Sequence, residues 1–280
     1  MDPKGPARRS DLATCALCGR SGIVGDVPTK LSHTPTRLDA VDALRGVAIV
    51  WMTLFHFCFD LSHDGWIRQN FYSDPFWTWQ RSAIVSLFLF CAGLGQAIAV
   101  AQGQAWGRFW RRWAQIAACA LGVSLGSLWM FPQSYIYFGV LHGMAVMLLL
   151  LRFAAPWARR HPAALCLLGL ALVGAKFLAA ALLSGSAAEL FNQKGLNWLG
   201  LVSKKPITED YVPLVPWLGV LLWGFAAGTW LQQSRAQVLA LSLPQALKPL
   251  AFLGRWSLSW YMLHQPALLG AIFLAGWLVR

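Results

Sequence analysis

The 280-residue chain is predicted to be an all-α, polytopic bundle of about seven transmembrane helices, and three observations support this fold class. Hydrophobic residues make up 57% of the chain and charged residues only 12%, with a mean hydropathy of +0.52. This composition is typical of a multi-pass membrane protein rather than a soluble domain. Several apolar stretches have the length needed to cross a bilayer, and the basic residues gather in alternate loops.

The apolar stretches predict the helices in chain order. They cover roughly 43–61, 82–101, 113–131, 135–151, 163–183, 213–232 and 255–278. Pro266 interrupts the last stretch, which a helix bundle tolerates through neighbouring contacts. The sixteen Trp and five Tyr cluster near several predicted helix ends, as in an interfacial aromatic belt. With no soluble domain or internal repeat evident, residues 38–280 are predicted to form one transmembrane domain.

The net charge of +12 is distributed by loop, which argues against nucleic acid as a partner. If the N-terminus is cytoplasmic, sixteen of the 23 Lys and Arg residues fall on the inner side, six on the outer side, and Lys176 within a span. The positive-inside rule then predicts an N-in, C-out topology. We therefore expect the charge mainly to set the orientation of the protein in the membrane.

Residues 1–37 mix Gly, Pro, Ser, Thr and both charge signs without an apolar period, which predicts a flexible cytoplasmic tail. No apolar segment follows its first basic residues, so a signal peptide is not expected. The tail carries a CxxC pair, Cys15 and Cys18, followed by His33. A second ligand pair is missing, so neither a metal nor a redox role is favoured. The other four cysteines fall inside predicted helices and suit packing.

Arg45 and His56 lie eleven residues apart in the first apolar stretch. In an α-helix, eleven steps of about 100° return to within roughly 20° of the starting direction, so both side chains lie on one face about 16 Å apart. Asp60 lies one turn beyond His56 and is placed to hold a ring nitrogen or bias its protonation. Ionisable groups at this depth are costly and are candidates for function. A carboxylate-supported histidine is suited to proton transfer.

Three further polar residues are expected between the outer edge and the middle of the bundle. His142 would lie seven residues into the fourth span, about 10 Å below the outer edge, and His264 nine residues above Arg255, near mid-membrane. Asp210 precedes the sixth span at its outer mouth. Together with His56 and Asp60 they are predicted to surround one outward-biased cavity. Each of these histidines could instead serve only as an interhelical hydrogen-bonding group.

Arg108, Arg111 and Arg112 form a basic cluster at the foot of the third span, at the level of Arg45. They can be explained either as topology signals or as a phosphate-binding group. A zinc site formed by the three histidines is a further alternative. The sequence lacks HExxH and any paired short-spacing ligand motif, so no metal is expected.

These motifs resemble those of the heparan-α-glucosaminide N-acetyltransferase-like (DUF1624) family of bacterial membrane proteins. The resemblance implies a multi-pass protein of a bacterial cytoplasmic (inner) membrane. The matching stretches are 38–46, 55–61, 88–93, 138–142, 210–217 and 254–266. That family is similar to the wider group of transmembrane acyltransferases, which use cytosolic acyl-CoA to modify sugars across the membrane. The related acyltransferase-3 family carries Arg-x10-His and Arg-x2-Arg motifs, which Arg45 with His56 and Arg108 with Arg111 match.

The resemblance implies that His56 is the catalytic histidine and that Arg45, Arg108 and Arg111 bind the acyl donor. We predict an integral-membrane acyltransferase that moves an acetyl group from cytosolic acetyl-CoA to an extracytoplasmic sugar or glycan-like acceptor. His56 would act as general base on the acceptor, or less readily carry the acyl group itself. Asp60 would orient His56.

In this prediction His142, Asp210 and His264 contact the acceptor, and no metal or nucleic acid takes part. The alternative is a proton-coupled transporter or flippase of a lipid-linked or small polar substrate, in which the same histidines relay protons. No inverted repeat or pair of broken helices in the sequence favours that alternative. A purely structural membrane subunit is a third possibility. Acceptor, acyl chain length and oligomeric state are left open by the sequence.

Overall fold

The computed structural model describes residues 38–235 and 243–279, and within these ranges it is helical, without a strand. Seven of the described helices are long and apolar enough to cross a membrane, which confirms the predicted fold class. The predicted N-terminal tail and its CxxC pair lie outside the described residues.

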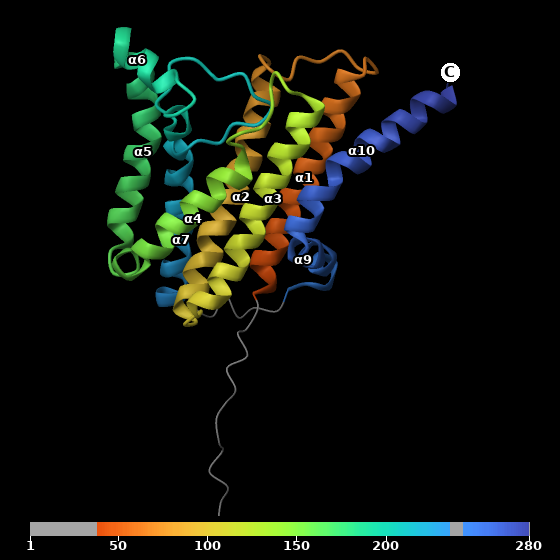
Figure 1. The fold of residues 1–280 in the computed structure, drawn as a ribbon. Coiled ribbons are helices and arrows are strands. Elements are labelled where there is room, and N and C mark those ends of the chain that lie inside the picture. The colour runs from red at the N-terminus through yellow and green to blue at the C-terminus, as the bar shows by residue number, and fades with distance from the viewer. Residues whose placement is uncertain (1–37, 236–242, 280) are drawn as a thin grey trace, which may run out of the picture. The chain divides into compact units, whose positions relative to one another are not determined.

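The candidate membrane helices alternate in direction along the bundle (Figure 1). They are α1 (Asp39–His63), α2 (Pro75–Ala101), α3 (Trp106–Met130), α4 (Val140–Ala158), α5 (Pro162–Leu182), α7 (Leu214–Ser234) and α10 (Ser257–Val279). Shorter elements connect them: α6 (Gly185–Asn192), η1 (Asn197–Leu199), η2 (Gln245–Leu247) and α9 (Lys248–Arg255). The start of α1 and the end of α10 lie at opposite ends (Figure 1). Following the predicted orientation, we call the end where α1 begins the inner end.

Local sequence explains where several helices begin and end. Asp74 caps α2 by accepting a hydrogen bond from the Phe76 N–H at 2.9 Å, and Pro75 occupies the first helical position, where its missing N–H costs nothing. Gly103 follows the end of α2 with φ of 66°, a left-handed conformation that favours glycine. The inner turn between α2 and α3 is therefore short.

Glycines bring three pairs of helices into backbone contact, and in one of them Gly169 of α5 faces Gly219 of α7. A Cβ at Gly93 of α2 would clash with the Leu221 carbonyl of α7, and a Cβ at Gly224 of α7 would clash with the Phe90 carbonyl of α2. Gly46 of α1 stands in the same relation to the backbone of α9. Small residues allow this close approach in membranes, where dispersion contacts and interhelical hydrogen bonds, rather than hydrophobic burial, drive helix association.

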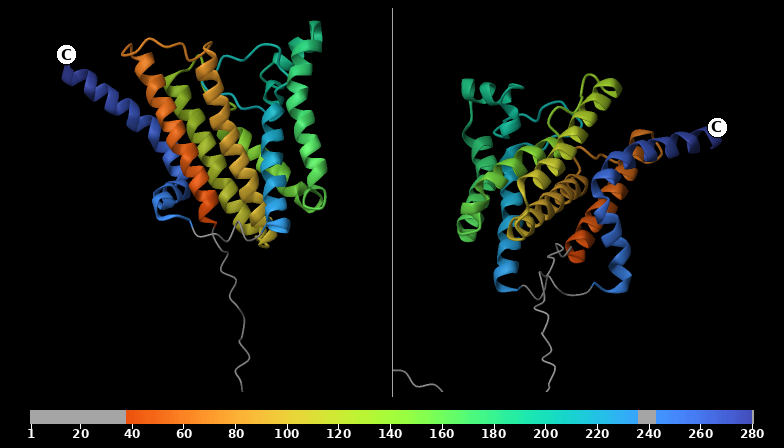
Figure 2. Two further views of the ribbon diagram at one scale, coloured as in Figure 1. Left: turned by 180° about the vertical axis from the view of Figure 1, so that it is seen from behind. Right: turned by 60° about the horizontal axis from the view of Figure 1, so that its bottom comes forward.

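The core lies between α2, α4 and α7, where Leu89, Met147, Leu151, Leu221 and Phe225 are fully buried. The outer surfaces of α3, α5 and α10 expose large apolar side chains, as a lipid-facing surface would. The C-terminal part of α10 leans away from the other helices in both side views (Figures 1 and 2). Polar residues buried in this bundle are therefore exceptions to a largely apolar interior.

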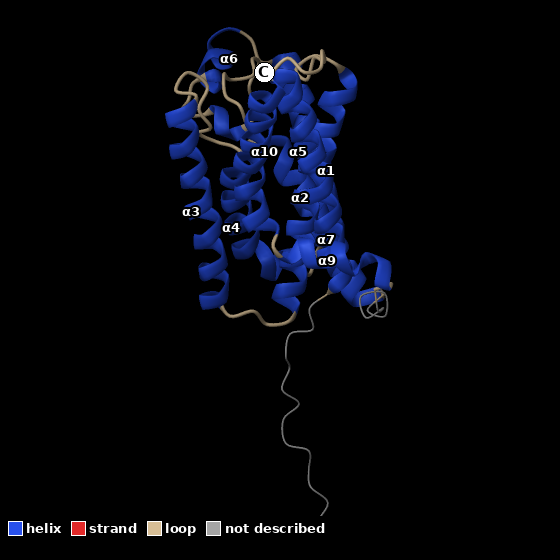
Figure 3. Ribbon diagram, turned by 90° about the vertical axis from the view of Figure 1, so that its right-hand side faces the viewer, coloured by secondary structure: helices blue, strands red, loops and turns tan. Residues whose placement is uncertain are grey.

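The fourth span differs from the sequence prediction. The structure places its start at Val140 rather than near residue 135, and residues 131–139 form a non-helical segment. This segment pairs with residues 208–212: Glu209 N–H donates to the Ser134 carbonyl and Val212 N–H to the Phe138 carbonyl. The predicted short turn near 131–135 is therefore wrong, because contacts far along the chain hold these apolar residues out of the helix. Loops gather at this outer end of the bundle (Figure 3).

Candidate active site

His56 of α1 and His264 of α10 lie against each other inside the bundle. Their ring centroids are 5.1 Å apart, with an interplanar angle of 61°. Nδ1 of His264 lies 2.7 Å from the Tyr261 carbonyl oxygen, which can only accept, so Nδ1 carries the proton in the neutral ring. Nε2 of His264 is buried and has no hydrogen-bond partner within the described residues. The lone pair of Nε2 is thus available to a proton donor.

Asp60 of α1 is buried and accepts two hydrogen bonds from the side-chain amide of Gln265, at 2.8 and 3.0 Å. Gln265 directly follows His264 in α10. The contact found for Asp60 therefore joins α1 to α10, and His56 itself makes no hydrogen bond to any residue in the described ranges. The structure brings Asp60 to the site through Gln265, which the sequence analysis missed.

His142 is the third residue of α4 and closes the N-terminal turn of that helix. Its Nδ1 accepts the Gly139 N–H at 3.3 Å, and its Nε2 lies 3.0 Å from Oγ of Ser124 in α3. Ser124 lies six residues before Met130, the end of α3, hence about 9 Å below that end. His142 therefore lies close to its expected depth. It reaches this depth because the segment 131–139 descends into the bundle, and not by seven residues of helix.

Asp210 meets the same helix end from the other side. Its Oδ2 accepts the Val140 N–H at 2.7 Å, so it satisfies a donor that a helix start leaves without an intrahelical partner. Non-helical backbone at membrane depth needs such partners. Ser127 and Thr208 supply others, since Oγ of Ser127 accepts the Ile136 N–H and Oγ1 of Thr208 donates to the Tyr135 carbonyl.

The surroundings of Asp210 act on its pKa in opposite directions. Burial raises the pKa of this carboxyl above its usual range, while the Val140 N–H and the cations Arg81 and Lys205 lower it. Asp210 is also close enough to Tyr261 for the two groups to interact electrostatically. Tyr261 in turn packs against His264, with ring centroids 5.8 Å apart.

A substitution at Asp210 should separate its two roles. Asp210→Asn keeps an oxygen that can accept the Val140 N–H and removes the buried charge. Because burial favours the protonated carboxyl, the charge makes the wild-type protein less stable as pH rises through the raised pKa. We expect Asp210→Asn to melt at or above the wild-type temperature at neutral pH, with a weaker pH dependence. Asp210→Ala should cost about 0.5–2 kcal/mol, the range for a lost helix cap. Because Ala also removes the charge, the cap is measured against Asp210→Asn, and equal melting temperatures for the Ala and Asn variants would contradict the capping role.

A cavity of about 230 Å³ runs between α1, α2, α3, α4 and α10. We call it the central cavity. Arg45 and Arg112 line it at the inner end, and Val140 and Tyr261 line it further out. The cavity thus extends from Arg45 and Arg112 to Val140 and Tyr261. Val140 is hydrogen-bonded to Asp210, and Tyr261 to His264.

Arg45 is held in place at the inner end of the central cavity. Its Nη1 lies 3.1 Å from a carboxylate oxygen of Asp42, whose side chain is 5% exposed. Its Nη2 lies 3.5 Å from the Cys91 carbonyl and packs directly on Gly95, where a Cβ would displace the guanidinium. The predicted shared face of Arg45 and His56 thus points into the bundle. Arg45 lines the central cavity, and His56 packs against His264.

The arginines of α3 divide into two groups. All three of Arg108, Arg111 and Arg112 are exposed, but only Arg112 lines the central cavity. Arg112 shares a helical stripe with Phe109, Trp113 and Ile116, which line the same cavity. This i, i+3, i+4, i+7 pattern is visible in the sequence and could have distinguished Arg112 from its neighbours.

No group of three or more His, Cys, Asp or Glu side chains in the described part of the chain could hold a metal ion. The polar groups of the site are instead a histidine pair, an aspartate–glutamine pair and inner arginines. These groups suit proton transfer and anion binding.

The fold and these groups define a multi-pass membrane protein with a polar site enclosed by its helices. The sequence profile of the family described as "Heparan-alpha-glucosaminide N-acetyltransferase, catalytic" matches residues 37–266, and the chain belongs to this family of membrane N-acetyltransferases. No curated protein and no solved structure gives a significant match to the chain.

Proposed function

We propose that this protein is an acyltransferase that moves an acetyl group from cytosolic acetyl-CoA to a sugar or glycan-like acceptor outside the membrane. The observation that carries the proposal is the central cavity, which starts at Arg45 and Arg112 and reaches Tyr261, the neighbour of His264. A donor entering from the inner side would place its anionic part near the arginines and its thioester toward the histidines.

The walls of the central cavity suit the pantetheine arm of acetyl-CoA. Within the described residues, Nε2 of Gln96 and Oε1 of Gln104 are buried without hydrogen-bond partners, and both residues line the cavity. Pantetheine contains two amide groups that could satisfy them. Its backbone is about as long as four extended residues, or roughly 14 Å. Arg45 and His56 are about 16 Å apart along the axis of α1, so an arm of this length nearly spans the distance from the arginine to the histidine.

In the proposed reaction, the acceptor oxygen or nitrogen attacks the thioester carbonyl carbon while the His56 ring takes its proton. A new C–O or C–N bond forms, the C–S bond breaks, and the thiolate of CoA leaves. The histidinium then returns the proton to the thiolate. Nε2 of His264, with its open lone pair, is placed to share the proton with His56. Direct transfer needs no acyl-histidine, although His56 as a covalent carrier gives the same products.

Asp60 and Gln265 would position the histidines by joining α1 to α10. Asp210 and His142, on either side of the α4 N-terminus, would border the acceptor side of the site. Arg108 and Arg111, exposed on the first turns of α3, would attract the anionic donor rather than enclose it.

One observation favours the second candidate, a proton-coupled transporter. Residues 131–139 and 208–213 are non-helical, and the 131–139 segment descends among the helices; broken backbone at membrane depth is used by transporters to bind substrates. Purified protein distinguishes the two functions. Release of CoA thiol from acetyl-CoA, together with acetylated glycans that are present in complemented cells and missing from deletion cells, supports the acyltransferase. Substrate uptake without CoA release would contradict it.

A matched pair of arginine variants tests the donor side. Arg112→Gln should raise the KM for acetyl-CoA about tenfold or more, because one charge-assisted contact is worth roughly 1.5–3 kcal/mol. Arg111→Gln removes the same charge one residue away, outside the cavity lining, and should change KM less than about threefold. The measurement is the KM for acetyl-CoA of both variants, on correctly inserted protein. Equal effects of the two variants would show that the cavity does not bind the donor.

A further inference from the structure

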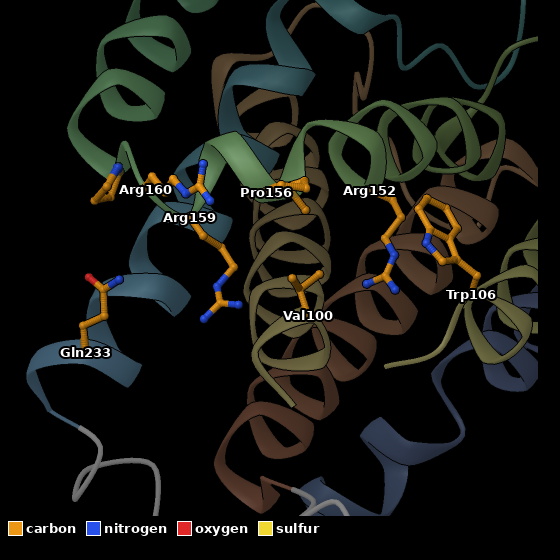
Figure 4. A pocket seen from close by; sticks show the side chains of 9 residues that line it. Val100, Trp106, Arg152, Pro156, Arg159, Arg160 and Gln233 are labelled. Atoms are coloured by element: carbon orange, nitrogen blue, oxygen red, sulfur yellow. The ribbon is translucent and has the colours of Figure 1, made fainter. Parts of the chain in front are cut away.

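A second cavity, of about 840 Å³, lies at the inner ends of α2, α3, α4, α5 and α7 (Figure 4). Arg152, Arg159 and Arg160 line it, together with Trp106 and Gln233. We call it the arginine pocket. From the sequence alone, these arginines are expected only to help orient the protein in the membrane.

Arg152 is the best defined of the three. It is 7% exposed, and its guanidinium carbon lies 4.9 Å from the Trp106 ring centroid and 5.3 Å from that of Phe109. One of its nitrogens donates to the Gln104 carbonyl. A guanidinium carries five N–H donors, so this single hydrogen bond leaves most of them for a ligand. A topology signal does not require burial, which is costly for a charge without a counter-ion.

No carboxylate balances this cluster within the described residues. The pocket lining contains no Asp or Glu, and none of the three arginines forms an ion pair with a described residue. Residues 236–242, in the next inner loop, contain no Asp or Glu in the sequence either. Three cations around one hollow therefore favour a multiply charged anion.

The arginine pocket adjoins the central cavity. Arg152 bonds to Gln104 and stacks on Phe109, and both of these residues line the central cavity. Val100 of the pocket directly follows Ala99 of the cavity in α2. Arg152 thus stands at the boundary between the two spaces.

We propose that the arginine pocket binds the 3′-phosphate at the nucleotide end of the acyl donor, with Arg152, Arg159 and Arg160 as ligands, while the diphosphate of the donor lies nearer Arg45 and Arg112. The inference rests on the proposed function and assigns it a second subsite. The Trp106 indole, already stacked on Arg152, supplies an aromatic surface beside this phosphate. The pantetheine arm would then pass Arg152 into the central cavity.

The test compares two double variants of the full-length protein in nonionic detergent. Arg159→Gln with Arg160→Gln removes two exposed charges of the pocket, and Arg235→Gln with Lys248→Gln removes two exposed inner charges outside it. The probe is adenosine 3′,5′-bisphosphate, and its Kd is measured directly. We expect the pocket variant to weaken binding at least about tenfold and the control to change it less than about threefold. Trp106→Leu should also weaken nucleotide binding.

Equal binding by the two double variants, with CoA-dependent transfer intact in the wild type, would overturn this inference alone. Wild-type protein that binds neither the bisphosphate nor CoA would contradict the proposed function as well. A parallel titration with phosphatidylglycerol distinguishes a lipid headgroup from a nucleotide. Pocket-dependent binding of the lipid without pocket-dependent binding of the bisphosphate would overturn the assignment.

Discussion

Replacing His56 with alanine is expected to lower acyl transfer about 10²–10⁴-fold, the usual cost of losing a general base. Acetyl-CoA binding should persist, because His56 is not part of the central cavity lining and the arginines at its inner end are unchanged. The measurement is the initial rate of CoA release at saturating donor, together with the Kd for CoA, at matched membrane expression.

The neighbours of His56 provide the controls. Asp60→Asn keeps an oxygen that can accept from Gln265 and should reduce the rate less than His56→Ala does. His264→Ala removes the ring that packs on His56 and should lower the rate by an intermediate factor. A near-normal rate for His56→Ala, combined with a complete loss for His264→Ala, would assign the base to α10.

Replacing Arg45 with glutamine is expected to have the second largest effect, on both donor binding and stability. The variant removes a cation from the central cavity, so the KM for acetyl-CoA should rise at least about tenfold. It also takes a partner from the buried carboxylate of Asp42, which should lower the free energy of unfolding by about 1–3 kcal/mol. Donor kinetics and the melting temperature report the two effects separately.

A double variant distinguishes these effects. Asp42→Asn combined with Arg45→Gln removes the buried charge that loses its cation at 3.1 Å in the Arg45→Gln variant. Arg255, which lies 3.8 Å from the Asp42 carboxylate, retains its 2.7 Å ion pair with Asp39. We expect the double variant to recover much of the melting temperature and none of the donor affinity. Recovery of both would mean that Arg45 acts only on the fold.

Apolar stretches of bilayer length were sufficient to predict all seven candidate spans, because membrane-crossing helices need long uninterrupted apolar sequence. The predicted start of the fourth span was wrong because an apolar stretch does not show where tertiary hydrogen bonds replace the helix. Tyr135 to Phe138 is apolar by residue type, but hydrogen bonds from Ser124, Ser127 and residues 208–212 hold it outside the helix. Such long-range partners leave no periodic signal in the sequence.

The candidate site was predictable to the extent that it depends on a single helix. Arg45 and His56 share α1, and their common face follows from helical geometry. The Asp60–Gln265 pair and the packing of His56 on His264 join residues more than 200 positions apart, so spacing along the chain does not reveal them. The helical stripe of α3 could have pointed to Arg112, but the motif resemblance directed the donor prediction to Arg108 and Arg111, and Arg152 was counted only as an inner charge.

The most direct test of the central role of His56 is a single-turnover assay across a membrane. Proteoliposomes with radiolabelled acetyl-CoA on the inner side of the protein and a glycan extract from deletion cells on the outer side would be compared at equal donor occupancy. The account predicts that wild-type protein moves label to the outer glycans, and that His56→Ala retains the bound donor and transfers almost none. Transfer by His56→Ala at close to the wild-type rate would contradict it.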